Sequence, residues 1–464
     1  MTHPRHIAVI DIGKTNAKLA LVDLETLTEI SVVTRPNVVI NAFPWPHFDT
    51  DGNWSFILDN LREFHREHRV DAISVTTHGA SIVLLDQSGN LATPILDYEH
   101  PIPAEVEAQY DAIRPSFAST GSPRLAGGLN VGAQLHWQFL TDPKLLERTA
   151  HVIGYPQYWA YRLTGEVAND VTSIGCHTDL WLPHQGKLSE LAATLGIAEK
   201  IAPVRKSGDV LGTILPEIAT ATGLAKDTPV VCGIHDSNAS LLPHLLTQDG
   251  QFSVVSTGTW VVVLTVGGDE VVLDPNRDTL INVNAFGDPV PSARFMGGRE
   301  FDLIQGEHPF EASEQDVDTV LSEGIMLMPA VENLTGPFQG QHMRWIGTEP
   351  PEGSGSRAIA LSYYLALMTS TCLKLTGASG PSIIEGPFAQ NTHFLAMLYT
   401  ATGRPVFGVK SATGTSVGAA QLFGNSVTGI AGEITQRPGN TTELIKYAAA
   451  WRTSVGRLKQ LEIG

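Results

Sequence analysis

Two stretches of this chain share one pattern: an apolar strand, a polar turn that contains glycine, and a second apolar strand. The first stretch is 6–23, with its turn at Gly13, and the second is 252–265, with its turn at Gly258. A pattern repeated at this distance predicts a duplicated fold. Each half then contributes one hairpin, and we expect the two hairpins to face each other across a cleft.

The first turn carries side chains suited to a phosphate group. Asp11 stands at the end of the first strand, where a carboxylate can hold a hydrated Mg²⁺. Gly13 lets the backbone approach a ligand closely. The residues that can bind phosphate oxygens or supply positive charge are Lys14, Thr15, Asn16 and Lys18. An ordinary hairpin turn is the alternative for this segment alone, whereas a Walker A loop is excluded because that motif needs glycine where the chain has Ala8.

The length and charge of the chain limit its fold and its partners. At 464 residues it suits two domains of roughly 200 residues each, and we place the boundary near 243–250, which gives domains 1–245 and 246–464. The formal net charge of −18 argues against nucleic acid or an anionic membrane as the main partner. An anionic cosubstrate would therefore need nearby lysine and Mg²⁺.

Cysteine content and hydropathy favour a soluble, cytoplasmic protein. Cys176, Cys232 and Cys372 are far apart and odd in number, which is typical of reduced thiols rather than of a disulfide framework. No apolar run approaches about 18 residues. The N-terminus lacks the apolar segment of a signal peptide.

Strands alternate with helices along the chain, which predicts an α/β layer fold. The pattern predicts a helix over 54–68, a strand over 70–77, a strand over 82–86 and a return strand over 94–96. In the second half, 357–376 has apolar residues at the spacing of a long amphipathic helix.

Polar residues follow two of the predicted strands. His78 and Gly79 come directly after the first, and Asp97 and Glu99 come after the second. A histidine at the mouth of a strand can face a ligand, and carboxylates at such a position suit sugar hydroxyls. A buried core histidine and a surface turn are the alternatives, and these residues leave both open.

A further chemical stretch lies over 228–240, where a buried strand breaks at Gly233 and a helix starts near Ser237. Ser237 is a candidate N-cap, with His235 and Asp236 directly before it. Asp236 would then lie near the positive end of the helix. Its carboxylate is placed to accept a proton from a hydroxyl, and a role as a helix cap is the alternative.

A third stretch follows the predicted strand 381–385. A loop that begins at Gly386 and contains Phe388 and Ala389 leads to a helix from Thr392. Such a strand, glycine loop and helix can receive a nucleotide base or phosphate at the helix N-terminus. The arrangement also occurs in many other α/β proteins.

With these motifs together, residues 6–425 resemble the FGGY carbohydrate kinases of the actin/Hsp70/hexokinase superfamily, and most of all the L-rhamnulokinases, with L-fuculokinases next. The resemblance implies two ribonuclease-H-like (actin-like ATPase) domains with a cleft between them. It rests on Asp11-Ile-Gly-Lys-Thr-Asn16, His78-Gly79, Tyr161-Arg-Leu-Thr-Gly165, Gly233-Ile-His-Asp236, Ser256-Thr-Gly-Thr-Trp260 and Pro387-Phe-Ala-Gln-Asn-Thr392.

The resemblance also implies an activity: transfer of the γ-phosphate of ATP to a ketose, with L-rhamnulose phosphorylated at O1 as our first expectation and Asp236 as general base. ATP and Mg²⁺ are the implied cofactors, Asp11 holds the metal ion, and a homodimer is compatible with the family. The candidate sugar-binding residues are His78, Gly79, Glu99, His235, Asp236, Ser237 and Asn284. The candidate nucleotide-binding residues are Gly13, Lys14, Thr15, Asn16, Lys18, Gly258, Thr259, Gly386, Phe388 and Ala389.

Two departures from the family pattern bear on specificity. The segment 97–100 lacks the arginine that often follows its aspartate, which concerns the identity of the sugar. The segment 385–388 replaces a run of three glycines, which concerns the nucleotide. The rival classes are an ATP-driven chaperone or filament protein, a sugar-responsive regulator without catalysis, and a metal hydrolase that uses His235 and Asp236.

Overall fold

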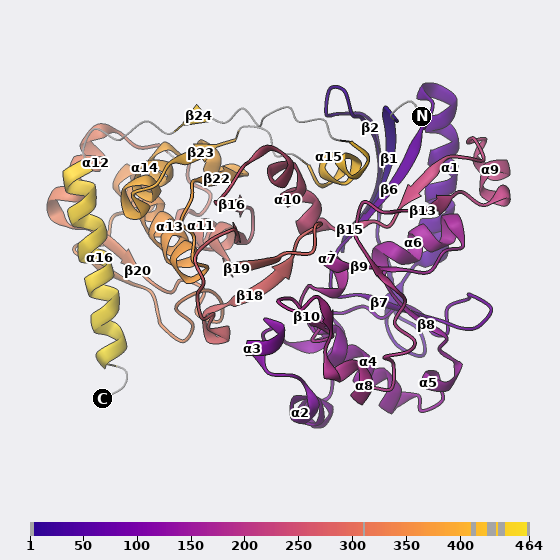
Figure 1. The fold of residues 1–464 in the computed structure, drawn as a ribbon. Helices are drawn as coiled ribbons and strands as arrows, with labels where there is room; N and C mark the ends of the chain where they lie inside the picture. Colours follow the sequence, from indigo (N-terminus) through magenta and orange to yellow (C-terminus); the bar gives the residue numbers. More distant parts are fainter. Residues whose placement is uncertain (1–3, 310, 410–413, 425–432, 435–440, 462–464) are drawn as a thin grey trace. The chain divides into compact units, whose positions relative to one another are not determined.

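The computed structural model describes residues 4–309, 311–409, 414–424, 433–434 and 441–461. The chain divides into two compact units (Figure 1). Unit 1 comprises Met1–Thr247, Ile281–Pro289 and Thr413–Thr428, and unit 2 comprises Gln248–Leu280, Val290–Ala412 and Gly429–Gly464. The units differ from the expected domains 1–245 and 246–464, because two segments of the second half belong to unit 1.

Unit 1 is built on a mixed sheet in the order β13-β14-β6-β1-β2-β3, with β15 also paired to β6. Antiparallel pairs join β1, β2 and β3, and parallel pairs join β6 to β1, β14 and β15. The strands are β1 (His6–Ile12), β2 (Asn16–Asp23), β3 (Thr28–Pro36), β6 (Ala72–Thr77), β13 (Val210–Thr213), β14 (Pro229–Val231) and β15 (Ile234–His235). The predicted first hairpin is confirmed.

Helices cover both faces of this sheet, as the alternation of side chains along β1 requires. Ala8, Ile10 and Ile12 pack in one apolar cluster with α1 (Thr50–His68) and α6 (Tyr155–Thr164). Ile7 and Val9 pack in a second cluster with α10 (Asp236–Thr247) and α15 (Thr415–Ala420). The predicted helix 54–68 is therefore present, but it begins four residues earlier, where Asp49 accepts a hydrogen bond from the Gly52 nitrogen as the N-cap.

The remaining part of unit 1 contains short helices and two-stranded sheets. The predicted return strand 94–96 is wrong: β7 (Ile82–Leu85) pairs with β8 (His151–Gly154), which lies much later in the chain. The other elements are β4 (Val39–Ile40), β5 (His47–Phe48), α2 (Ala104–Ile113), α3 (Phe117–Thr120), α4 (Val131–Thr141), α5 (Leu145–Arg148), β9 (Asn169–Asp170), α7 (Val171–Ile174), β10 (Trp181–Leu182), β11 (Lys187–Leu188), α8 (Glu190–Thr194), β12 (Val204–Arg205) and α9 (Pro216–Thr222).

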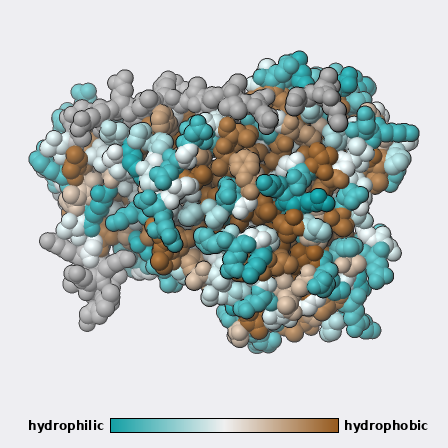
Figure 2. Space-filling view, viewed as in Figure 1, coloured by the Kyte–Doolittle hydropathy of each residue, from teal (hydrophilic) through white to brown (hydrophobic). Residues whose placement is uncertain are grey.

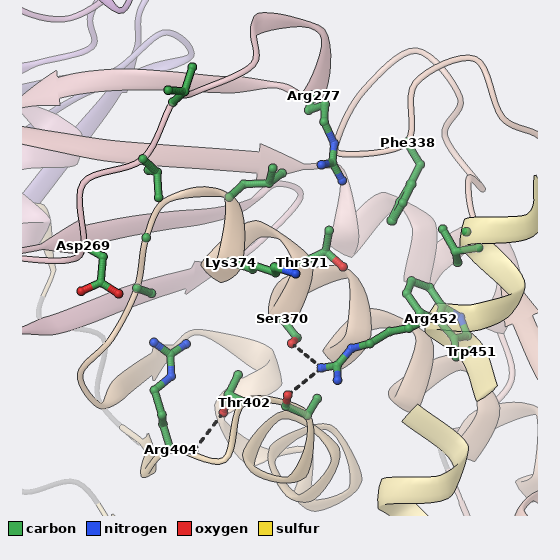
Figure 3. A pocket seen from close by; sticks show the side chains of 18 residues that line it. Asp269, Arg277, Phe338, Ser370, Thr371, Lys374, Thr402, Arg404, Trp451 and Arg452 are labelled. Carbon is green, nitrogen blue, oxygen red and sulfur yellow. Dashed lines mark hydrogen bonds between the residues drawn. The ribbon is translucent and has the colours of Figure 1, made fainter. Parts of the chain in front are cut away.

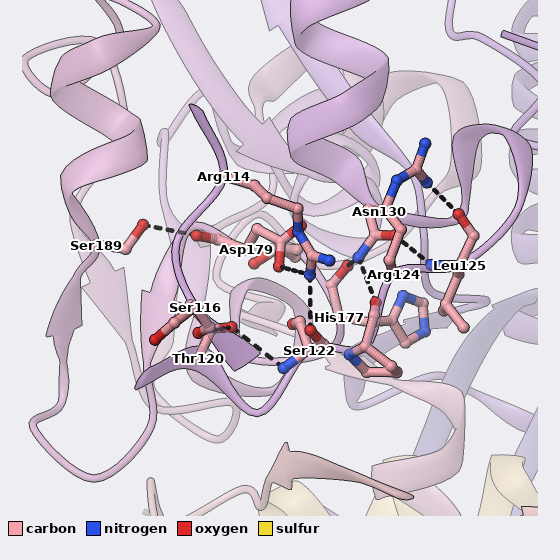
Figure 4. A network of polar contacts seen from close by, with 12 residues as sticks. Arg114, Ser116, Thr120, Ser122, Arg124, Leu125, Asn130, His177, Asp179 and Ser189 are labelled. Carbon is pink, nitrogen blue, oxygen red and sulfur yellow. Dashed lines mark hydrogen bonds and ion pairs between the residues drawn. The ribbon is translucent and has the colours of Figure 1, made fainter. Parts of the chain in front are cut away.

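A buried polar network ties these short elements together (Figure 4). The carboxylate of Asp179 is buried and accepts hydrogen bonds from the Tyr110 hydroxyl and, at 2.9 Å, from the Arg114 guanidinium. Arg114 also donates to the Ser122 carbonyl oxygen at 2.7 Å. Because each charge has a partner, the network can be buried without an unpaired ion.

Unit 2 repeats the plan of unit 1 with a sheet in the order β18-β19-β17-β16-β22-β23-β24. As in unit 1, the first strand of the hairpin pairs antiparallel with the second and parallel with a later strand. The strands are β16 (Phe252–Thr257), β17 (Val261–Val266), β18 (Thr279–Val283), β19 (Pro289–Phe295), β22 (Ser382–Glu385), β23 (Val406–Gly408) and β24 (Glu433–Ile434). The predicted second hairpin is confirmed, and the two sheets share the duplicated plan.

The long helix predicted over 357–376 is α13 (Gly355–Leu375), and it is buried on nearly every side rather than amphipathic. Among the described residues it is the one helix long and apolar enough to cross a membrane, but 83% of its apolar window is buried inside the protein. The other elements of this unit are α11 (Gly297–Gln305), α12 (Glu314–Glu323), β20 (Met326–Met328), β21 (Arg344–Ile346), α14 (Thr392–Thr402) and α16 (Thr441–Leu461). Polar residues cover much of the face seen in Figure 2.

Candidate active site

Three strand ends meet at one edge of the unit 1 sheet. The parallel register places Ile12 of β1 opposite Thr77 of β6, and Thr77 opposite His235 of β15. Because the carboxyl ends of parallel strands lie at the same edge of a sheet, the residues that end these strands come together. Asp11, His78 and Asp236 are therefore neighbours, although they are far apart in the sequence.

Asp236 is the first residue of α10, not the residue before an N-cap, so the prediction that Ser237 caps this helix is wrong. The Ser237 backbone nitrogen instead donates to Asp236 Oδ1 at 2.6 Å. The side chain of Asp236 is 35% exposed, and its Oδ1 lies 3.1 Å from His235 Nε2. Burial raises the pKa of Asp236, whereas nearby His78 and the Ser237 hydrogen bonds lower it. The carboxylate is thus a stronger base than an ordinary aspartate and can be reached by a ligand.

His235 is held in a defined orientation behind Asp236. Its backbone nitrogen donates to Thr172 Oγ1 at 2.9 Å, and the Asn238 side-chain nitrogen lies 3.4 Å from its Nδ1. Asn238 can only donate through this nitrogen, so Nδ1 accepts and Nε2 carries the proton. Burial lowers the pKa of His235 to about 4, which keeps the ring neutral. The Nε2–H group therefore faces the Asp236 carboxylate.

Gly79 has a steric role in this arrangement. A Cβ atom at this position would lie 2.7 Å from His235 Nε2, closer than real Cβ contacts. A glycine is needed here because any side chain would push the imidazole away from Asp236.

His78 is buried, and one of its ring nitrogens has no partner. Nδ1 donates to the Gly79 carbonyl oxygen at 2.8 Å, so the neutral ring presents Nε2 as an acceptor. Within the described part of the chain, that buried Nε2 has no hydrogen-bond partner. Burial lowers the pKa of His78 to about 4, and Asp236 acts in the opposite direction. A buried acceptor without a partner beside a base is suited to a substrate hydroxyl.

Asp11 fits the role of a metal-binding carboxylate. Lys18 Nζ lies 3.3 Å from its Oδ2, directly across the hairpin. Burial raises the pKa of Asp11 to about 6, Lys18 lowers it, and Asp236 raises it further. A cation between two such carboxylates would relieve their repulsion. Mg²⁺ keeps several waters and binds through one or two carboxylates.

Lys14 is paired with carboxylates of the segment 97–99. Its ammonium group forms ion pairs with Asp97 and, at 3.1 Å, with Glu99, and it lies 4.7 Å from the centre of the Tyr98 ring. The buried Asp97 carboxylate needs a counter-charge, and Lys14 supplies it. Lys14 thus lies between two carboxylates, and the roles of Lys14 toward a phosphate and of Glu99 toward a sugar stay predictions. Elsewhere in this turn, the Gly13 nitrogen donates to the Asn16 carbonyl oxygen, and Thr15 and Asn16 are both exposed.

Asn284 has a structural task. Its Oδ1 accepts hydrogen bonds from the Phe286 and Asp288 nitrogens at 2.9 and 3.0 Å, and these bonds close the turn within the unit 1 segment Ile281–Pro289. The side-chain oxygen is therefore used by the turn, and only its amide N–H groups can serve a sugar.

Two functional supports in unit 1 were missed from the sequence. The buried carboxylate of Asp170 accepts hydrogen bonds from the backbone and hydroxyl of Thr172 and from the Ser207 hydroxyl. Thr172 in turn holds the His235 nitrogen. The pattern Asp-x-Thr at the start of a short helix was the available signal for a cap, but nothing local indicated its link to His235.

Unit 2 contains a cavity of about 610 Å³ between the hairpin turn, the start of α11 and the start of α14. Of the predicted nucleotide-binding residues, Gly258, Thr259 and Phe388 line it, and Gly386 and Ala389 do not. Gly386 supports the loop from behind, because a Cβ atom there would lie 2.0 Å from the Thr257 carbonyl oxygen. The lining residues that the sequence prediction omitted are Gly298, Phe301, Asp302, Ala312, Pro387, Gln390, Asn391, Thr392 and His393.

Two local features shape this cavity. A Cβ atom on Gly298 would lie 2.1 Å from the Gly258 carbonyl oxygen, so glycine allows α11 to begin against the hairpin turn. Asn391 caps α14 by accepting from the Phe394 nitrogen, and the first residues of that helix face the cavity. A helix N-terminus favours an anionic group, and Phe301 and Phe388 provide an apolar wall. The cavity suits a nucleotide.

Each half of the chain matches a known protein family. Residues 6–243 match the N-terminal domain of the FGGY family of carbohydrate kinases, and residues 249–431 match the C-terminal domain of carbohydrate kinase FGGY. The chain belongs to the FGGY family. The described fold is accordingly the two-domain fold of these kinases, of the actin-like ATPase type.

Individual relatives share only part of their sequence with this chain. An L-fuculokinase of Salmonella typhi is 27% identical over 269 residues, which cover 56% of this chain and 57% of that protein. A probable L-xylulose kinase of Pasteurella multocida is 28% identical and covers 55% of this chain and 54% of its own length. The matches thus span little more than half of these curated relatives. The crystal structure of a carbohydrate kinase from Novosphingobium aromaticivorans is 35% identical, with a TM-score of 0.91, and covers 98% of this chain and 100% of that one.

Proposed function

We propose that this protein transfers the γ-phosphate of ATP to a hydroxyl of a ketose, with Asp236 as general base. The observation that carries the proposal is the Asp236 carboxylate at the start of α10, partly exposed, with a raised pKa and with the neutral His235 3.1 Å away. Membership in the FGGY family and the nucleotide-sized cavity in unit 2 support it.

The residues of unit 1 have distinct tasks in this mechanism. Asp236 accepts the proton of the sugar hydroxyl. The oxygen of that hydroxyl bonds to the γ-phosphorus, while the bond from phosphorus to the ADP oxygen breaks. His78 Nε2 accepts a hydrogen bond from a second hydroxyl and so orients the sugar. Asp11 would hold Mg²⁺, which supplies charge neutralisation on the phosphates. The turn residues Thr15 and Asn16 donate to phosphate oxygens.

For the substrate we propose a 6-deoxyketohexose, with L-rhamnulose phosphorylated at O1 as the first candidate and L-fuculose as the second. The resemblance of 235–237 and 256–260 to L-rhamnulokinases supports the first. The similarity to enzymes named L-fuculokinase in Salmonella typhi and Escherichia coli supports the second. A few side-chain contacts separate such sugars, so the substrate must be measured.

The test is Mg²⁺-dependent conversion of ATP to ADP with a ketose panel of L-rhamnulose, L-fuculose, L-xylulose and D-ribulose. We expect one or more sugars to stimulate turnover. Asp236→Asn should reduce sugar-dependent turnover by about 10²–10⁴-fold, the usual contribution of a general base. The matched control is Asp227→Asn, at an exposed aspartate outside the site, which should behave as wild type.

Nucleotide binding must be measured on the same proteins. Asp236→Asn should retain it, because the cavity in unit 2 contains no part of α10. If no sugar stimulates turnover while ADP still binds, the ketose assignment is wrong and a sugar-sensing protein without catalysis becomes the better explanation.

A further inference from the structure

A second cavity in unit 2, of about 890 Å³, shares no lining residue with the nucleotide cavity (Figure 3). The ends of α13 and α14, the loop after β17 and the face of α16 enclose it. Its walls combine aromatic and aliphatic side chains, among them Phe338 and Trp451, with several cationic groups.

Four cations converge on this cavity: Arg277, Lys374, Arg404 and Arg452. The one carboxylate in its lining is that of the exposed Asp269. Such an excess of positive charge is unusual in a chain whose net charge is −18. It creates a local field that attracts anions in an otherwise repelling protein.

These cations also differ from others in the same unit. Arg294, Arg299 and Arg357 each lie within 2.9 Å of a carboxylate oxygen. Within the described residues, the ion pairs include none of the four cavity cations. None of the four is therefore held in an ion pair within the part of the chain that the structure describes.

Support of helix ends explains only some of these side chains. Arg452 donates to the Ala401 carbonyl oxygen at 2.6 Å, in the last turn of α14, and to Ser370 Oγ at 3.3 Å. Lys374 lies in the last turn of α13, where a cation favours the helix dipole. Arg404 has neither role: its Nη1 is buried and, among the described residues, has no hydrogen-bond partner.

The shifted pKa values of three of the four cations agree with their lack of ion pairs among the described residues. Burial lowers the pKa of Arg277, Arg404 and Arg452, which means that their charged forms have lost part of their hydration. Asp274 partly offsets this effect at Arg277, and Asp269 does so at Arg404. A bound anion would stabilise the charged forms of these groups further.

We propose that this cavity is a binding site for an organic phosphate, separate from the nucleotide cavity. The guanidinium groups of Arg277 and Arg404 and the ammonium group of Lys374 hold the phosphate, since planar guanidinium groups match phosphate oxygens. Phe338 and Trp451 flank the organic part. The volume exceeds what a phosphate alone would fill, which favours a ligand of the size of a sugar phosphate.

The test is isothermal titration calorimetry of the full-length protein with glucose 6-phosphate, glucose and inorganic phosphate, each in saturating ADP so that the nucleotide site is occupied. We expect glucose 6-phosphate to bind with a stoichiometry of one and glucose not to bind. The double variant Lys374→Gln/Arg404→Gln should bind at least about tenfold more weakly, because two charge-assisted contacts are lost. Arg344→Gln, at an exposed arginine outside the cavity, is the matched control and should bind as wild type.

The outcomes separate the parts of the proposal. Absence of binding by glucose 6-phosphate at millimolar concentrations, or equal affinity in the double variant, would overturn it. Binding of inorganic phosphate as tight as that of glucose 6-phosphate would overturn the role of Phe338 and Trp451. If the double variant does not fold, Lys374→Gln alone serves, because Lys374 is exposed. None of these results depends on the kinase activity.

Discussion

At the scale of single residues, the candidate active site depends on groups whose ionisation is shifted by their neighbours. Asp11 and Asp236 each carry a raised pKa, mainly from burial, and Asp236 raises the pKa of Asp11 further. His78 and His235 are kept neutral by burial. With a pKa of about 6, Asp11 is ionised near neutral pH beside two neutral imidazoles, an arrangement that suits a divalent cation and a sugar.

The shifted pKa of Asp11 predicts how activity depends on pH and Mg²⁺. The ionised carboxylate binds the cation, so kcat/KM should fall as the pH decreases through about 6. Mg²⁺ competes with the proton and should therefore move this acidic limb to lower pH as its concentration is raised tenfold. The measurement is a pH profile of kcat/KM at several Mg²⁺ concentrations. A limb that stays in place would contradict the role of Asp11, and Asp11→Asn, as the control, should lose the Mg²⁺-dependent movement.

At the scale of elements, the short helix α7 positions a residue of another element. Thr172 Oγ1 accepts from the buried His235 nitrogen at 2.9 Å and donates to Asp170 Oδ2 at 2.6 Å. Thr172→Val keeps the shape but leaves the His235 nitrogen without its acceptor and removes one of the hydrogen bonds to Asp170. We expect a loss of about 1–3 kcal/mol in the free energy of unfolding, measured by urea denaturation. Thr172→Ser retains the hydroxyl and is the matched control, so an equal loss in both variants would refute the hydrogen-bond explanation.

The contact between α11 and α13 should make stability depend on pH. Glu300 of α11 is buried and accepts from the Tyr364 hydroxyl of α13 at 3.0 Å. Burial raises the pKa of Glu300 from 4.5 to about 7, so the folded state keeps a proton that the unfolded state releases. The stabilisation from this group is complete below pH 4.5 and is lost as the pH rises through about 7.

Glu300→Gln removes this ionisable group and should remove its pH dependence. We subtract the unfolding free energy of wild type from that of the variant at each pH. This difference should be roughly 2–4 kcal/mol larger at pH 8 than at pH 4.5, because the pKa of Glu300 rises from 4.5 to about 7 on folding. Urea denaturation of both proteins across this range provides the measurement. Parallel curves for variant and wild type would show that Glu300 does not titrate in this way.

At the scale of the whole molecule, the net charge of −18 acts on every anionic ligand that approaches. The described lining of the cavity that we propose for the nucleotide contains no lysine or arginine to offset it. Association of a nucleotide should therefore be slowed by repulsion that salt can screen. At the basic cavity near Arg404 salt should have the opposite effect, because it screens the attraction between the cations and an anion and so weakens binding.

The association rate constant of a fluorescent ADP analogue should accordingly increase a few-fold between about 0.01 M and about 0.15 M KCl, as the Debye length falls from about 30 to about 8 Å. Stopped-flow measurements at fixed Mg²⁺ test this, with NaCl in place of KCl as a control for specific ion effects. A rate constant that decreases with salt would show that local cations, rather than the net charge, govern the approach.

Much of the plan was predictable from the sequence, because its signals are local. Both hairpins have the expected strands, since period-two alternation and a glycine turn encode them within a few residues. The sequence also placed His78 and Asp236 near the ends of strands, whereas their approach became evident only from the parallel pairing of β6 with β15. Gly258, Thr259 and Phe388, which the family motifs singled out, line one cavity of unit 2.

The tertiary structure alone decided which distant groups become partners. The ion pair between Lys14 and the buried Asp97 carboxylate joins residues 83 positions apart, and nothing local in the sequence indicated it. β7 could have paired with the segment that follows it, but it pairs with β8 instead. Gly298 gave no signal of its close approach to Gly258. Patterns within the sequence determine which elements form, because they reflect local geometry, whereas their partners result from a competition in burial and charge that is settled only when the whole chain is packed.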